Sequence, residues 1–167
     1  LLPLGEWKLS TKDNGREKVD SKIIVKKEEI IKETISMSAQ SGIHFSITKE
    51  DGSPTPCKAQ IIGIDGTPSP KLGPVDRAHG CVDQYHSENG NFSIGLAPGK
   101  YRIVVTRGIE HDHFEKQVEI KKGKFETLQT ALIRSVNTKG WVSTDFHNHS
   151  TPSGDIRHIV VYIRRYG

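Results

Sequence analysis

The sequence predicts a mostly β protein built around an antiparallel β-sandwich of about seven strands. Short segments in which apolar and polar residues alternate recur between 43 and 134. Turns rich in Gly, Pro, Asn and Asp separate these segments, as expected for strands joined by tight connections. No part of the chain shows a strong helical period. Strands at this spacing without intervening helices favour a sandwich over an α/β fold.

The predicted strands of the sandwich follow one another closely. Residues 43–48 alternate in polarity, and the turn at 50–54 joins them to an apolar run at 57–64, which is typical of a hairpin. The density of Gly, Pro and Ser predicts a long loop over 65–74. The remaining predicted strands are 80–87, 92–96, 101–107, 114–120 and 125–134.

The first 41 residues predict a separate, incomplete β unit. Short apolar segments at 7–9 and 22–26 favour strands, and the polar stretch 10–21 favours a loop. Residues 29–35 fit both the helix and the strand period, but their Ile and Thr side chains favour a strand. We expect the partner strands of this unit upstream of Leu1. The missing initiator Met likewise leads us to expect a start inside a longer protein.

Composition and charge exclude some function classes. The net charge of +4 over 167 residues is spread along the chain, so a nucleic-acid role is not indicated. No apolar run approaches the roughly 18 residues of a membrane span, and residues 1–5 are too short for a signal peptide. The two cysteines, Cys57 and Cys81, permit one disulfide or two reduced core thiols.

The most informative segment lies near the C-terminus. Side chains alternate along an extended chain, so Asp145, His147 and His149 point the same way, with neighbours roughly 7 Å apart. Imidazole suits zinc, iron, copper and nickel, and the carboxylates of Asp145 and Asp155 extend the choice to manganese. A catalytic metal needs about three protein ligands and an open position for water. The segment therefore predicts the beginning of a hydrolase site.

A second pair of histidines has the same spacing. His111 and His113 flank Asp112 in a predicted loop between two strands. They are either metal ligands or solvated polar residues, and the loop setting favours the second interpretation.

Three stretches of the predicted sandwich carry a resemblance. Residues 50–56, 90–92 and 96–103 resemble the carboxypeptidase regulatory-like, prealbumin-type sandwich. In that family a Gly-x-Pro sequence opens the second strand and a Pro-Gly-x-Tyr sequence links two central strands, and this chain has both in that order. The resemblance implies a prealbumin-like sandwich domain at 42–135, a scaffold that by itself names no chemistry.

Residues 140–155 resemble a catalytic domain. They are similar to the opening of the polymerase-and-histidinol-phosphatase (PHP) superfamily, in particular its CehA/McbA-like metallohydrolase branch. The resemblance implies that His147 and His149 bind a multinuclear centre of zinc, manganese or iron, that Asp155 is a further candidate ligand, and that Asp145 orients a ligating imidazole. Many members read Ser-Asp-Gly where this chain reads Ser153-Gly154-Asp155. Residues 136–167 are thus expected to form a linker and the first strand of a truncated PHP-type barrel.

These observations predict a fragment of a metal-dependent hydrolase. Its parent is expected to act on a small-molecule ester or phosphoester with a metal-activated water, whereas this chain alone is expected to be inactive because most of the barrel is absent. The sandwich type and the cysteines suggest a secreted or periplasmic protein. The alternative is a non-catalytic sandwich that binds carbohydrate or a partner domain, for which Tyr85 and Tyr101 are candidate stacking residues.

Overall fold

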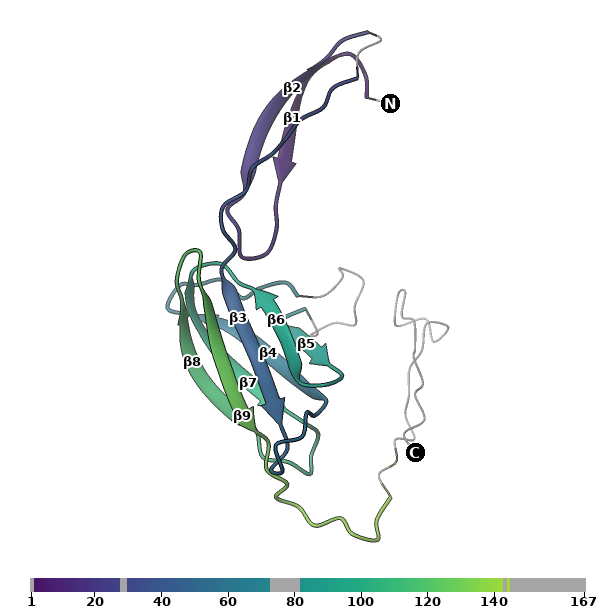
Figure 1. Ribbon diagram of the computed structural model, residues 1–167, viewed down its shortest axis with the longest axis vertical. Coiled ribbons are helices and arrows are strands. Elements are labelled where there is room, and N and C mark those ends of the chain that lie inside the picture. The colour runs from purple at the N-terminus through teal and green to yellow at the C-terminus, as the bar shows by residue number, and fades with distance from the viewer. Residues whose placement is uncertain (1, 28–29, 73–81, 143, 145–167) are drawn as a thin grey trace.

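The computed structural model describes residues 2–27, 30–72, 82–142 and 144, and within these residues it contains strands and no helix. An N-terminal hairpin stands on one end of a β-sandwich, and the chain leaves the sandwich at the opposite end (Figure 1). The prediction of a mostly β protein with a sandwich is therefore confirmed. The predicted strand at the start of a barrel falls on residues that the structure does not describe.

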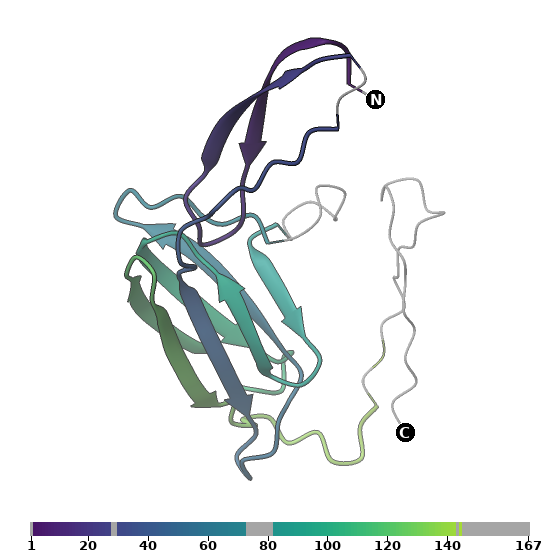
Figure 2. The same ribbon diagram turned by 45° about the horizontal axis from the view of Figure 1, so that its top comes forward.

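Two sheets stacked face to face form the sandwich (Figure 2). One sheet has three strands in the order β6-β3-β9, and the other has four in the order β5-β4-β7-β8. The strands of the sandwich are β3 (Gly42–Thr48), β4 (Cys57–Ile64), β5 (Gln84–Ser87), β6 (Asn91–Gly95), β7 (Gly99–Thr106), β8 (Phe114–Ile120) and β9 (Phe125–Ala131).

One pair of strands departs from the predicted antiparallel arrangement. β3 pairs with β6 in antiparallel orientation but with β9 in parallel orientation, from Gly42↔Phe125 to Thr48↔Ala131. β8 belongs to the other sheet, so the turn after it carries the chain across the sandwich. The Gly42 N–H donates to Lys124 O at 3.0 Å at this crossing. β9 therefore starts at the same end as β3 and runs the same way.

The core lies between the two sheets and follows from the alternation in each strand. In β7, Tyr101, Ile103 and Val105 are each at most 1% exposed, and their neighbours in sequence face outward. Fully burying one such aliphatic side chain contributes about 1.5–3 kcal/mol. The other fully buried large side chains come from both sheets and their flanking turns, and they are Ile43, Ile47, Ile61, Leu96, Ile120, Leu128 and Leu132.

The N-terminal hairpin consists of β1 (Gly5–Thr11) and β2 (Val19–Val25), which pair over their full length. The prediction of a loop over 10–21 is wrong at both ends. The Ser10 hydroxyl donates to Asp20 Oδ1 at 2.5 Å across the strands. This hydrogen bond joins polar residues that the sequence had placed in a loop, and the two strands pair there as well. The prediction of a strand over residues 29–35 is wrong for 30–35, which pair with no strand in the described part of the chain.

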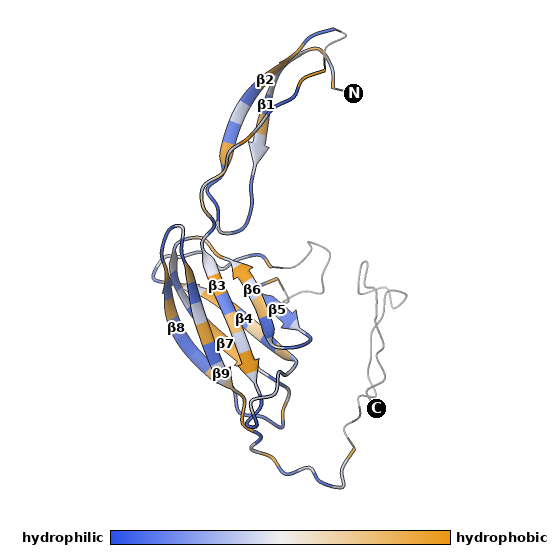
Figure 3. Ribbon diagram, in the orientation of Figure 1, coloured by the Kyte–Doolittle hydropathy of each residue, from blue (hydrophilic) through white to orange (hydrophobic). Residues whose placement is uncertain are grey.

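Hydrophilic and hydrophobic residues alternate along the hairpin (Figure 3), and because successive side chains of a strand point to opposite sides, its two faces differ. Lys8 pairs with Asp20 at 2.9 Å on the polar face. Trp7, Leu9 and Ile23 share the opposite face, which is apolar. A hollow of about 880 Å³ lies against this apolar face and is lined mainly by aliphatic side chains of the hairpin and of the segment that follows it. A single two-stranded layer cannot enclose a core.

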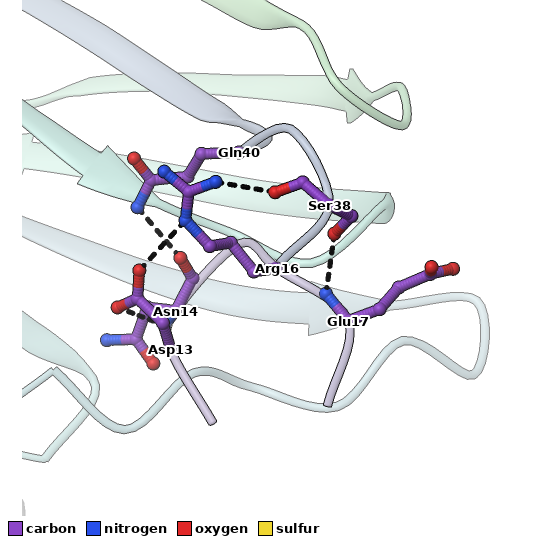
Figure 4. A network of polar contacts seen from close by, with 6 residues as sticks. All are labelled: Asp13, Asn14, Arg16, Glu17, Ser38 and Gln40. Atoms are coloured by element: carbon purple, nitrogen blue, oxygen red, sulfur yellow. Dashed lines mark hydrogen bonds and ion pairs between the residues drawn. The ribbon is translucent and has the colours of Figure 1, made fainter. Parts of the chain in front are cut away.

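The turn of the hairpin is fixed to the sandwich (Figure 4). Arg16 Nη1 donates to Ser38 O at 2.5 Å, and Gln40 Nε2 donates to Asn14 O at 2.9 Å. Gly15 is buried, and a Cβ built there would lie 2.1 Å from Ser41 O. The hairpin is therefore held at its turn by close backbone packing and a small polar network.

Candidate functional site

The residues predicted to bind metal lie outside the described residues. Asp145, His147, His149 and Asp155 all fall in the range 145–167. Their geometry stays a prediction, as does the catalytic role implied for them. Cys81 also lies outside the described residues. Cys57 is buried and has no disulfide to any residue that the structure describes, and the choice between a disulfide and two reduced thiols depends on Cys81.

The structure describes how the chain approaches this segment. After β9, Arg134 holds the chain against the end of the sandwich. Its Nη2 donates to Glu110 Oε2 at 2.7 Å and to Thr138 Oγ1, and its backbone N–H donates to Glu50 Oε1 at 3.2 Å. Its Nε donates to Val136 O at 3.3 Å. One guanidinium thus joins a loop of the sandwich to the segment that leads toward residue 145.

Large apolar side chains are exposed at this end of the sandwich. Trp141 is 82% exposed and Val142 is 83% exposed, both shortly before the predicted metal motif. Ile109, in the loop before β8, is 94% exposed. Trp141 and Val142 are therefore left largely uncovered by the residues that the structure describes.

The second histidine pair lies at the same end. His111 forms an isolated antiparallel bridge with Arg134, and Asp112 N–H donates to Ile133 O at 2.9 Å. His111 is half-buried and its Nδ1 has no hydrogen-bond partner among the described residues, whereas His113 is exposed. No group of three or more His, Cys, Asp or Glu side chains within the described ranges is placed to hold a metal ion. Backbone pairing therefore accounts for the position of His111.

A hollow of about 600 Å³ lies where β4 begins and where β5 and β7 end. Sequence analysis missed it. Its walls include Lys58, His86 and Arg107. The strand register places Lys58 directly opposite His86 on β5 and opposite Thr106 on β7. The three basic residues are distant in sequence, so only the pairing of strands could have revealed the group.

Cys57 lines the same hollow, but its thiol is unreactive. Burial raises the pKa of its thiol to about 11, and the nearby Arg107 only partly opposes this effect. The thiol is therefore protonated near neutral pH and is a poor nucleophile. It adds no negative charge to the hollow.

The tyrosines considered for carbohydrate stacking have packing roles. Tyr101 is 1% exposed and its hydroxyl donates to Ala97 O at 2.8 Å, as expected for a core residue. Tyr85 is half-buried and stacks on Phe92 at 4.8 Å between ring centroids. Phe92 stacks in turn on Phe45 at 4.4 Å, so the three rings join the edge strands of the two sheets.

Comparisons with known proteins leave the family open. No protein-family model matches the chain, and no curated protein matches it significantly. In the described part of the chain, no helix is long and apolar enough to cross a membrane.

Proposed function

We propose that this chain is part of a metal-dependent, phosphoesterase-like hydrolase, and that its sandwich is of the prealbumin type. The observation that carries the proposal is the run from Asp145 to Asp155, which follows directly on a β-sandwich. Two imidazoles and two carboxylates within eleven residues form a donor set that suits zinc, iron or manganese. The resemblance to the opening of PHP metallohydrolases supports the same chemistry.

In this proposal His147 and His149 hold the metal, and Asp155 is a third ligand. Asp145 accepts a hydrogen bond from a ligating imidazole and so fixes its tautomer and orientation. The bound metal would lower the pKa of a water molecule toward neutrality and neutralise charge on a phosphoryl or ester oxygen. A small-molecule phosphoester is the leading substrate class, with a carboxylic ester or carbamate as the second.

The described structure supports a scaffolding role for the sandwich. Among the residues that the structure describes, the buried hydrophobic side chains lie between 43 and 132, ahead of the motif in the sequence. Arg134 then fixes the first residues after the core to Glu110 and Thr138. Such an anchor would limit the positions that the following segment can reach. We propose that the exposed Trp141 and Val142 pack against the hydrolase domain.

Metal uptake by the purified chain tests the proposal. Zinc and manganese would be titrated into the protein and into His147→Ala/His149→Ala, and the bound metal would be counted by elemental analysis. We expect stoichiometric binding that the double substitution abolishes. The matched control is His111→Ala/His113→Ala, which removes the other histidine pair and should leave binding unchanged.

Two outcomes would count against the proposal. Uptake that survives the loss of His147 and His149 but not of His111 and His113 would place the metal at the wrong pair. No uptake by the unsubstituted chain would leave the non-catalytic binding module as the better interpretation.

A further inference from the structure

The hollow at the start of β4 has an unbalanced charge. Lys58, His86 and Arg107 line it, and none of its described lining residues is Asp or Glu. A neighbouring hollow of about 330 Å³ shares Arg107 but is also lined by Glu50 and Glu110. The second hollow therefore places carboxylates near Arg107, whereas the described lining of the first hollow supplies no carboxylate.

The two permanent cations of the first hollow make no ion pair with any residue that the structure describes. Lys58 is half-buried on the outward side of β4. Arg107 is half-buried as well, and its one hydrogen bond to a described residue runs from Nη1 to Thr55 Oγ1. Thr55 is completely buried, so this bond ties the guanidinium to the fixed end of the sandwich.

A tethered guanidinium retains N–H groups for a further acceptor. Its planar fork matches two oxygens of a phosphate or carboxylate, and an adjacent ammonium adds a mobile point charge. The hydroxyl of Thr106, which faces Lys58 across the strands, adds a neutral donor beside them. Since burial raises the pKa of the Cys57 thiol, this side chain adds no negative charge that would compete for these donors.

We propose that this hollow binds a tetrahedral oxyanion of the phosphate class. Lys58 and Arg107 together carry two positive charges, which match a phosphate dianion better than a carboxylate. His86, opposite Lys58 in the register, lies within the same wall. The proposal does not rest on the metal motif, because every residue it uses belongs to the sandwich.

Titration of the full chain with inorganic phosphate, followed by amide NMR, tests this site. We expect saturable shifts at residues 57–58 and 106–108, and a smaller affinity for acetate. Lys58→Gln should weaken phosphate binding by about tenfold, because it removes a charged hydrogen-bond donor. Lys116→Gln is the matched control, since it removes the same charge from an exposed position on β8 and should leave the affinity unchanged.

The substitution Arg107→Lys distinguishes the contribution of the planar guanidinium from that of its positive charge. It keeps the positive charge but loses the fork, so it should weaken phosphate more than acetate while the thermal midpoint shows that the fold persists. Three results would overturn the proposal. The chemical shift changes could grow linearly with phosphate concentration, or sodium chloride could reproduce them at equal ionic strength. They could also become smaller by the same amount in Lys58→Gln and Lys116→Gln. Equal affinity for phosphate and acetate would overturn the assignment to a tetrahedral anion.

Discussion

The hairpin and the sandwich are built from the same kind of strand but solve the burial problem differently. In the sandwich, two sheets face each other and strands such as β7 bury every second side chain almost completely. In the hairpin, Trp7 and Ile23 pair across one layer and remain only half-buried. Alternation alone thus makes a strand, and a second layer is needed to make a core.

This difference in burial explains why the hairpin is held in place by contacts at its turn. Its apolar face is not closed by any described sheet, and Leu4 and Ile30 beside the hollow there are 64% and 89% exposed. Its firm contacts lie instead at the turn, where Gly15 and Arg16 meet the sandwich. We therefore expect the sandwich to set the global stability of the chain and the turn to set the order of the hairpin.

Truncating a core side chain should produce the largest effect. Ile103→Ala removes a side chain that is 0% exposed between the sheets and should lower the free energy of unfolding by about 2–5 kcal/mol. Ile24→Ala makes the same chemical change in β2, where the residue is 60% exposed, and should stay within about 0.5 kcal/mol. Urea denaturation measures both. Similar losses at the two positions would mean that the hairpin contributes to the same cooperative core.

Adding one methyl group at the turn should have the next largest effect. Gly15 and Gly52 have nearly equal left-handed φ angles of +75° and +78°, so replacement by Ala strains either backbone by roughly 1 kcal/mol. Only at Gly15 does the new Cβ collide with the backbone, at Ser41 O; at Gly52 nothing lies within 4 Å.

Hydrogen exchange reads out the difference between these two glycines. Gly15→Ala should accelerate amide exchange throughout β1 and β2 while β3 and β7 stay protected. Gly52→Ala should leave the hairpin as it was. If both substitutions had the same effect on the hairpin, close packing at Gly15 could not be what holds it.

Much of the sandwich was predictable because its signals are local. The apolar run at 57–64, between the turn at 50–54 and the loop predicted at 65–74, predicted β4 with its observed bounds, Cys57–Ile64. The parallel pairing of β3 with β9 was not predictable, since it depends on the chain crossing between sheets after β8. The extent of the hairpin was underestimated because Ser10 and Asp20 are poor strand formers whose mutual hydrogen bond compensates.

The two candidate sites were predictable to different degrees. The metal motif is contiguous, so its residues could be named from the sequence alone. The basic hollow joins Lys58 on β4, His86 on β5 and Arg107 directly after β7, and only the pairing of these strands brings the three residues together.

The smallest effect should come from single polar contacts between the hairpin and the sandwich. Arg16→Ala removes a half-buried guanidinium that bonds Ser38 O and Asp13, so the hairpin should lose about 1 kcal/mol of protection in amide exchange. Lys122→Ala removes an ion pair with Glu17 across the same junction, but both side chains are about two-thirds exposed and solvent screens the pair. It should leave exchange unchanged. A larger increase in amide exchange for Lys122→Ala than for Arg16→Ala would mean that the exposed ion pair orders the hairpin, rather than the partly buried hydrogen bond to the backbone.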